Sequence, residues 1–146
     1  AGTDLEACID EARKLSVHNK VTFHGKMDRN DIDAFYKSAD IFVFPSFREP
    51  TGGVVIEALS FGLAMIVLDH GGPQSTVNNS VAIKLNISTP QALVEDLANQ
   101  ITSLSLDDKR REEMAYNALE YCKKNYLWES KVKGFSHTMM NWMIEK

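Results

Sequence analysis

Two glutamates, Glu49 and Glu57, flank the segment PTGG and could take part in chemistry together or separately. Glu49 follows the apolar run DIFVFPS, and Glu57 lies within the apolar segment GGVVIEALSF. Carboxylates can work as a general acid and base, bind a metal ion, or accept hydrogen bonds from the hydroxyl groups of a sugar. Which chemistry applies depends on the elements that position the two side chains.

The segment between the glutamates predicts a turn from a strand into a helix. DIFVFPS is an unbroken apolar run that reaches a proline, as expected of a parallel strand buried on both faces. Glu49 is then expected in the loop at the carboxyl end of that strand, where open α/β sheets bind ligands. Gly52 and Gly53 are expected at the helix N-terminus, where free amides and the helix dipole favour an anion such as phosphate.

Glu57 is expected about one turn into this helix, roughly 6 Å along the axis from Gly53 at ~1.5 Å per residue. A carboxylate there can accept two hydrogen bonds from a vicinal diol such as a ribose edge. The segment therefore suits a sugar–diphosphate–ribose ligand, with Glu49 toward the sugar and Glu57 toward the ribose. Two ordinary surface carboxylates remain the alternative interpretation of the same pattern.

The rest of the chain alternates between helical and strand-like patterns. This alternation predicts an α/β, Rossmann-like fold with a mainly parallel sheet and helices on both faces. Because the chain opens on a helix, capped by Thr3 with Glu6, we expect it to start inside a domain and to lack the first strands of the sheet. The predicted elements are a helix at 3–15, a strand at 20–25, a helix at 29–39, strands at 40–46 and 64–69, a loop at 70–75, a strand at 82–86 and helices after residue 90.

The composition is that of an ordinary globular domain. Apolar residues make up 44% of the 146 residues and charged residues 25%, and the formal net charge is -4. An acidic chain without blocks of like charge has no field that attracts nucleic acid or anionic lipid. No signal peptide and no apolar run of membrane-spanning length occurs, so we expect a cytoplasmic protein. Cys8 and Cys122 lack metal-ligand spacing and are expected to be buried thiols.

The segment PSFREPTGGVVIEALSFG resembles the signature PS…E-P-F-G-x-V-x-x-E-A-x-x-x-G of family 4 (group 1) retaining glycosyltransferases, which have the two-domain GT-B fold. KVTFHGKMDRNDIDAFYKSADIFVFPS is similar to the part of the family that precedes this motif, and AMIVLDHGGPQSTV to the strand and GG-P-x-E-x-V loop that follow it. The resemblance covers most of the chain and is weakest after Pro90. Two positions depart from the pattern: Thr51 replaces phenylalanine, and Ser75 replaces glutamate.

The resemblance implies that residues 1–146 are the C-terminal, donor-binding domain of a two-domain glycosyltransferase, and that the acceptor-binding N-terminal domain is absent. It implies that Glu49 is the catalytic residue and contacts the donor sugar, and that Glu57 binds the ribose hydroxyls. It also implies that backbone amides contact the sugar and diphosphate, at positions matching Thr51, Gly52 and Gly53. The region where the family packs the nucleobase matches Gly25, Lys26 and Met27.

The implied reaction is transfer of a sugar from a nucleotide-diphosphate donor, with retention, to a hydroxyl of a glycan or lipid-linked acceptor. The full-length enzyme is expected to work in polysaccharide or glycolipid assembly, at the inner face of a membrane, with no nucleic acid partner. The isolated chain is expected to be inactive. A degenerate domain that serves only as a binding or scaffold module stays open as the alternative, since Thr51 and Ser75 depart from the pattern. A two-carboxylate glycoside hydrolase is less well supported, because glycoside hydrolysis does not require a helix N-terminus suited to binding phosphate.

No metal site and no cofactor beyond the donor are expected. Asp31 and Asp33 form the D-x-D pair seen in metal-dependent glycosyltransferases of a different fold. Here they lie in the first turn of a predicted helix, where acidic side chains interact favourably with the dipole. The four histidines show no ligand spacing such as i and i+4.

Overall fold

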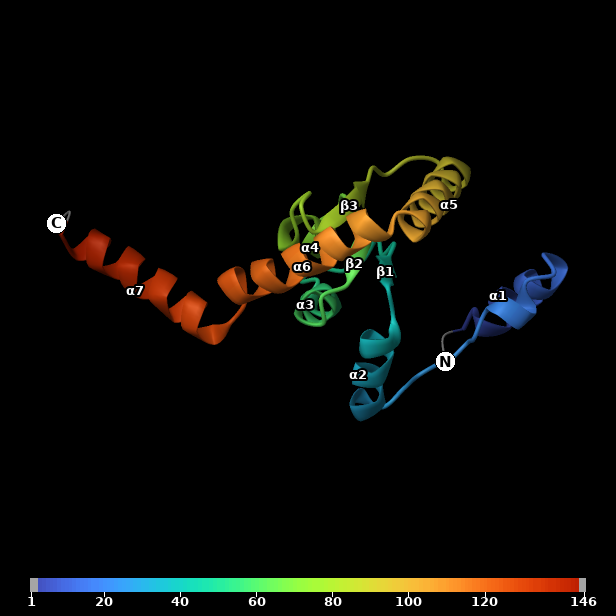
Figure 1. The fold of residues 1–146 in the computed structure, drawn as a ribbon, viewed down its shortest axis with the longest axis horizontal. Helices are drawn as coiled ribbons and strands as arrows, with labels where there is room; N and C mark the ends of the chain where they lie inside the picture. The colour runs from blue at the N-terminus through green and yellow to red at the C-terminus, as the bar shows by residue number, and fades with distance from the viewer. Residues whose placement is uncertain (1–2, 145–146) are drawn as a thin grey trace. The chain divides into compact units, whose positions relative to one another are not determined.

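The computed structural model describes residues 3–144, without the side chains of residues 137, 138, 141 and 144. The chain divides into two compact units, residues 1–37 and 38–146. Figure 1 shows the elements of both units along the chain.

The first unit holds helix α1 (Leu5–Lys14), the short 3-10 helix η1 (His18–Lys20) and most of helix α2 (Arg29–Ser38). The predicted strand at 20–25 is wrong: after η1 the segment 21–25 forms no strand. A strand needs a neighbour for its backbone hydrogen bonds, and within residues 3–144 no strand pairs with this segment. The predicted capping box is also wrong, because the N-cap position is Asp4 and no side chain caps α1.

The second unit is built on a three-stranded sheet in the order β1-β2-β3. Strands β1 (Ile41–Phe44), β2 (Ala64–Leu68) and β3 (Ala82–Leu85) are parallel throughout. Val43 pairs with Ile66, and Ile66 pairs with Ile83. Since the strands are parallel, the segments that follow β1 and β2 both leave the sheet at the carboxyl ends of its strands. The predicted α/β fold with a parallel sheet is confirmed.

Five helices complete this unit: α3 (Gly53–Ser60), α4 (Gly71–Thr76), α5 (Pro90–Leu106), α6 (Asp108–Asn125) and α7 (Trp128–Ile144). The predicted loop at 70–75 is wrong, because residues 71–76 form α4. The run HGGPQS has the composition of a loop, but Pro73 falls in the first turn of α4, where a helix has no use for its backbone N–H.

The core lies around β2, whose five residues are all buried. Because successive side chains point to opposite faces, β2 is buried on both faces of the sheet. On one face, Ala64, Ile66 and Leu68 pack with Leu93 and Leu104 of α5 and with Met114 of α6. The four residues of β1 are only half-buried. The predicted full burial of that strand is wrong, since β1 is an edge of the three-stranded sheet.

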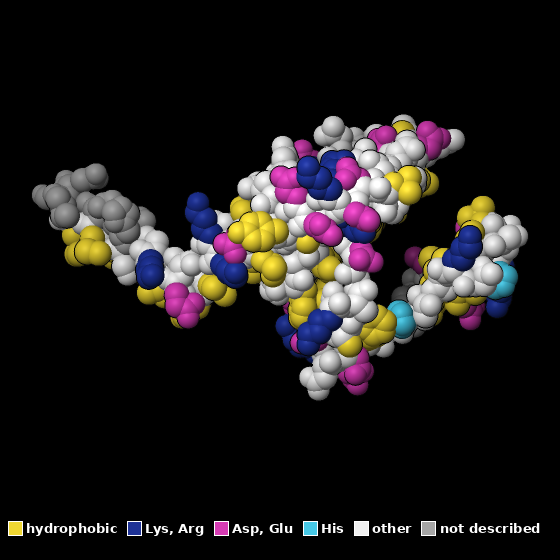
Figure 2. All heavy atoms as spheres, viewed as in Figure 1, with side chains coloured by type: hydrophobic (Ala, Val, Ile, Leu, Met, Phe, Trp, Pro, Cys, Tyr) yellow, Lys and Arg dark blue, Asp and Glu magenta, His cyan; other side chains and the backbone are white. Residues whose placement is uncertain are grey.

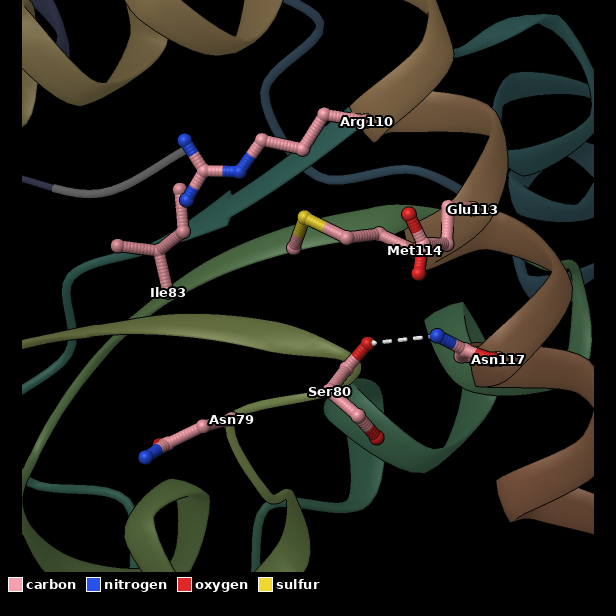
Figure 3. Close-up of a pocket in the computed structure, with 7 residues that line it drawn as sticks. All are labelled: Asn79, Ser80, Ile83, Arg110, Glu113, Met114 and Asn117. Carbon is pink, nitrogen blue, oxygen red and sulfur yellow. Dashed lines mark hydrogen bonds between the residues drawn. The ribbon is translucent and has the colours of Figure 1, made fainter.

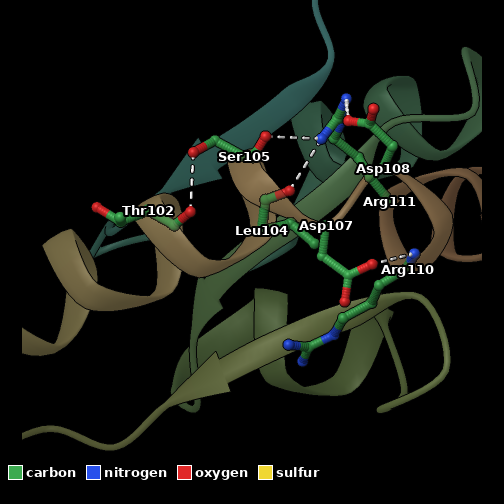
Figure 4. Close-up of polar contacts among 7 residues, drawn as sticks. All are labelled: Thr102, Leu104, Ser105, Asp107, Asp108, Arg110 and Arg111. Carbon is green, nitrogen blue, oxygen red and sulfur yellow. Dashed lines mark hydrogen bonds and ion pairs between the residues drawn. The ribbon is translucent and has the colours of Figure 1, made fainter.

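The turn from α5 into α6 is held by charged groups (Figure 4). The Arg111 guanidinium donates to the carbonyls of Leu104 and Ser105 at 3.0 and 3.1 Å and pairs with Asp108 at 2.6 Å. These carbonyls belong to the last turn of α5, which has no intrahelical donors for them. Asp107 accepts from the backbone N–H of Arg110 at 3.0 Å and so caps α6.

Cys122 of α6 is buried, as predicted, but Cys8 is exposed, because α1 buries only Ala12 among its residues. The space-filling view shows apolar side chains at the surface of α7 (Figure 2), where Trp128 is 80% and Phe135 68% exposed. Over residues 3–144, no helix combines the length and the apolar character needed to cross a membrane.

Candidate functional site

The carboxylate of Glu49 is fixed by the backbone that follows it. Its Oε1 atom accepts hydrogen bonds from the N–H of Gly52 at 3.0 Å and the N–H of Thr51 at 3.2 Å. The Thr51 hydroxyl donates to the same oxygen at 3.0 Å. Within residues 3–144, Oε2 of Glu49 receives no hydrogen bond, so one carboxylate oxygen is held and the other is open to a ligand.

These hydrogen bonds favour the ionised carboxylate. The Gly52 N–H, then the Thr51 N–H and then the Thr51 hydroxyl hold the pKa of Glu49 below its ordinary value of 4.5. A carboxyl group whose folded-state pKa is lowered stabilises the fold above its ordinary pKa and loses that contribution as the pH falls through the lowered value. Glu49 is therefore a charged hydrogen-bond acceptor at neutral pH and is poorly suited to hold a proton as a general acid.

The start of helix α4, after β2, supports the loop of Glu49. The Gly72 N–H donates to the Glu49 carbonyl at 2.8 Å. A Cβ on Gly72 would lie 2.6 Å from the Thr51 nitrogen and 2.7 Å from the Gly52 nitrogen, so only glycine allows this approach. The Glu49 loop and the start of α4 contact each other through backbone atoms, which leaves little freedom for the Glu49 carboxylate.

Thr76 of α4 strengthens this contact. Its side chain is buried, and its hydroxyl donates to the Gly72 carbonyl at 2.8 Å and approaches the Thr51 carbonyl at 3.4 Å. The Ser75 hydroxyl also donates to the Gly72 carbonyl, at 2.9 Å. Ser75, which replaces the glutamate of the resembled motif, is thus used to hold its own helix.

Helix α3 begins directly after the Glu49 loop. Gly52 is its N-cap residue and has a left-handed backbone, with φ of 67°. The amides of Gly53 and Val54 come next, in a turn where an α-helix has no intrahelical acceptors for them. No other acceptor among the described residues takes them. Two backbone donors therefore remain open beside Glu49, at the positive end of the helix dipole.

Glu57 lies four residues after Gly53 in α3, so the two residues share one face of the helix. Val55, Ala58 and Leu59 form the buried face, whereas Glu57 is half-buried. Glu49, Thr51, Gly52, Gly53 and Glu57, the predicted sugar, diphosphate and ribose residues, thus lie along one continuous loop and helix start.

The three residues predicted near the nucleobase lie in the first unit, in the segment between η1 and α2. Gly25 has a left-handed backbone, with φ of 66°. Lys26 is exposed and Met27 half-buried. The neighbouring His24 ring contacts the Phe35 ring edge-on, with centroids 4.3 Å apart. The assignment of Gly25, Lys26 and Met27 to the nucleobase stays a prediction.

The structure adds three features that the sequence reasoning missed. They are the backbone contact of Gly72 with the Glu49 loop, the buried Thr76 hydroxyl behind it, and the open amide of Val54. The GGP motif and the spacing of Thr76 from it were a signal for the first two. No sequence signal showed that Glu49 occupies the amides of Thr51 and Gly52.

The described residues contain no group of three His, Cys, Asp or Glu side chains that could hold a metal ion. Asp31 and Asp33 are exposed near the start of α2, as expected of a solvated helix start. The absence of a metal from the reaction stays a prediction.

A polar pocket lies at the other end of the sheet, between the start of β3 with the residues before it and helix α6 (Figure 3). The Asn117 side chain donates to the Ser80 carbonyl across it at 3.3 Å. Ser80 precedes β3, whereas Glu49 and Gly72 follow β1 and β2, so this pocket lies away from Glu49 and Gly72.

The family model described as glycosyl transferases group 1 matches residues 1–121. The chain belongs to the group 1 glycosyltransferases. A curated relative, D-inositol 3-phosphate glycosyltransferase of Corynebacterium kroppenstedtii, is 30% identical over 127 residues, which are 87% of this chain and 27% of the relative. The chain therefore spans little more than a quarter of the length of that group 1 relative.

Solved structures of other proteins share the fold. Sucrose-phosphate synthase from Thermosynechococcus elongatus superposes with a TM-score of 0.78 and 25% sequence identity, over 99% of this chain and 36% of that one. HepE of Anabaena, solved in complex with UDP, gives a TM-score of 0.77 at 22% identity, over 94% of this chain and 36% of that one. The predicted family membership and the predicted fold class are confirmed.

Proposed function

We propose that this chain is the C-terminal domain of a two-domain glycosyltransferase and binds a nucleotide-diphosphate sugar at the Glu49 loop and the start of α3. The observation that carries the proposal is the open pair of amides at Gly53 and Val54, which lie between a fixed carboxylate and a second carboxylate one turn further along the helix. Two helix N-terminal amides suit a phosphate oxygen.

The hydrogen bonds to Glu49 limit which backbone N–H groups remain for a ligand. The amides of Thr51 and Gly52, predicted to contact the sugar and diphosphate, are used by Glu49. We therefore assign the diphosphate to Gly53 and Val54. We assign Glu49 Oε2 to a sugar hydroxyl, because the hydrogen bonds to this carboxylate fall on Oε1. We assign Glu57 to the ribose hydroxyls.

The proposed reaction in the full-length enzyme is transfer of the sugar, with retention, to a hydroxyl of a glycan or lipid-linked acceptor that an N-terminal domain would bind. The helix amides would stabilise the charge that develops on the leaving diphosphate. Glu49 would orient the sugar. Its three hydrogen bonds lower the basicity of the carboxylate, which makes it a poor covalent nucleophile.

The similarity to a UDP-bound protein of the same fold supports a nucleotide-linked donor. A lipid-linked acceptor would bring the full-length enzyme to the cytosolic face of a membrane. We propose that transfer needs no metal ion and that the N-terminus of α3 meets part of the diphosphate charge.

Glu57→Ala is expected to weaken nucleotide binding by about 1.5–3 kcal/mol, the range for hydrogen bonds to a charged group. The measurement is calorimetric titration of the full-length enzyme with UDP-, GDP- and ADP-sugars, followed by titration of the variant with whichever donor binds.

Glu112→Ala is the matched control for Glu57→Ala, because Glu112 is an exposed helical glutamate in α6. It should bind the donor as the wild type does. Equal affinities in the wild type and Glu57→Ala would contradict the ribose assignment. Failure of every donor to bind would favour the alternative, a non-catalytic binding or scaffold module.

A further inference from the structure

Thr51 provides a side-chain contact to the proposed catalytic carboxylate. Its hydroxyl donates to Glu49 Oε1 at 3.0 Å, beside the two backbone N–H groups at 3.0 and 3.2 Å. The signature that this segment resembles has phenylalanine at this position, and a phenylalanine ring offers no hydroxyl donor. The third hydrogen bond on Oε1 is therefore a property of this chain's own threonine.

We propose that Thr51 is a positioning residue for Glu49, whose hydroxyl holds Oε1 so that Oε2 stays directed at the donor sugar. The part concerning the sugar rests on the proposed function. The part concerning the carboxylate rests on the observed hydrogen bonds alone.

The physical reason is preorganisation. A glutamate side chain has several rotatable bonds, and freezing them at the moment of reaction costs conformational entropy. Backbone donors at Thr51 and Gly52 fix Oε1 from the helix side, and the hydroxyl adds a donor that rotates with the Thr51 side chain. A carboxylate already held in its working geometry lowers the barrier of the reaction it supports.

The same hydroxyl contributes to the low pKa of Glu49, after the two backbone N–H groups. Other charged groups around the loop are few. Arg48 precedes Glu49, Glu57 lies in α3, and Asp69 and His70 lie in the loop after β2, whereas α4 has no titratable side chain. All of them stay unchanged in a Thr51 variant, so a shift in the titration of Glu49 reports the lost hydroxyl.

The first test compares Thr51→Val, which keeps the branched shape and loses the hydroxyl, with Thr51→Ser, which keeps the hydroxyl. The Glu49 carboxyl is followed by NMR titration of the ligand-free full-length protein labelled with ¹³C-glutamate, and its resonance is assigned with Glu49→Gln. We expect the pKa of Glu49 to rise toward 4.5 in Thr51→Val and to keep its wild-type value in Thr51→Ser.

The second readout is the rate of sugar transfer. Thr51→Val should lower kcat about fivefold to tenfold with KM little changed, the size expected for the net contribution of one typical hydrogen bond. Thr51→Ser should restore most of the rate. A purely structural role for Thr51 would change thermal stability in both variants without separating kcat from KM.

The proposal is overturned if Thr51→Val has the wild-type pKa of Glu49 and the wild-type rate of sugar transfer. It is also overturned if Thr51→Ser behaves like Thr51→Val. The proposed function fails separately: if the wild type binds none of the UDP-, GDP- and ADP-sugars while the predicted pKa pattern holds, the positioning of Glu49 stands and its assignment to a donor sugar falls.

Discussion

Glu49→Gln is expected to reduce sugar transfer by the full-length enzyme about 10²–10³-fold, the usual cost of removing one preorganised electrostatic group. Glutamine keeps a carbonyl oxygen that can accept from Thr51 and Gly52, so the loop stays held while the negative charge is lost. Affinity for the free nucleoside diphosphate should stay at the wild-type value, because Glu49 is assigned to the sugar. Initial rates and calorimetric titration check the two halves of this expectation.

Comparison of Glu49→Ala with Glu49→Gln distinguishes loss of the negative charge from loss of the hydrogen-bond acceptor. Alanine removes the acceptor as well and leaves the Thr51 and Gly52 amides without their partner, so we expect a further loss of thermal stability relative to Glu49→Gln. Transfer at the wild-type rate in Glu49→Gln would contradict the catalytic assignment. A loss of nucleotide affinity as large as the loss of rate would indicate that Glu49 contacts the nucleotide and not the sugar.

Gly72→Ala is expected to have a large effect through the backbone. The new Cβ would lie 2.6 Å from the Thr51 nitrogen, 2.7 Å from the Gly52 nitrogen and 2.7 Å from the Pro50 carbonyl carbon. Backbone atoms cannot move aside as a flexible side chain can, so the Glu49 loop and the start of α4 must separate. We expect a loss of about 1–3 kcal/mol in the free energy of unfolding, as for other overpacked sites, with a loss of transfer because the Glu49 loop is displaced.

The matched control is Gly53→Ala, since a Cβ on Gly53 meets nothing within 4 Å. Its free energy of unfolding should change by less than about 1 kcal/mol, in the direction of greater stability, because alanine is the better helix residue. Urea denaturation followed by circular dichroism compares the two variants. Equal stabilities of Gly72→Ala and the wild type would show that the Glu49 loop and the start of α4 are not held by this contact.

The sequence allowed the second unit to be predicted well, because its signals are local. The apolar run of β2 is buried along its whole length, and the glycines after Glu49 mark the start of α3. Strand signals depend on a partner, however. Residues 20–25 have the composition of a strand, but in the described residues no neighbour pairs with them, and residues 21–25 form no strand.

The candidate site was predicted at the level of position but not of hydrogen bonding. The order strand, loop and helix places Glu49, Gly53 and Glu57 along one segment, and the spacing was enough to see this. Which amides stay open could not be predicted, since it depends on the rotamer of Glu49 and on the left-handed backbone of Gly52. The support from Gly72 and Thr76 joins residues far apart in the chain. The GGP motif and the spacing of Thr76 marked the supporting segment, but not which atoms of the Glu49 loop it contacts.

The proposed diphosphate site depends on the two neighbouring glycine amides at the start of α3. The Gly52 amide is taken by Glu49, and the Gly53 amide is open to the diphosphate. Full-length protein labelled with ¹⁵N-glycine is titrated with the nucleotide sugar that binds in calorimetry, and the Gly53 resonance is assigned by its loss in Gly53→Ala. We expect the Gly53 resonance to show the largest shift among the glycine amides. A Gly53 resonance that does not shift on saturation, or that shifts less than the Gly52 resonance, would contradict the assignment of the diphosphate to Gly53.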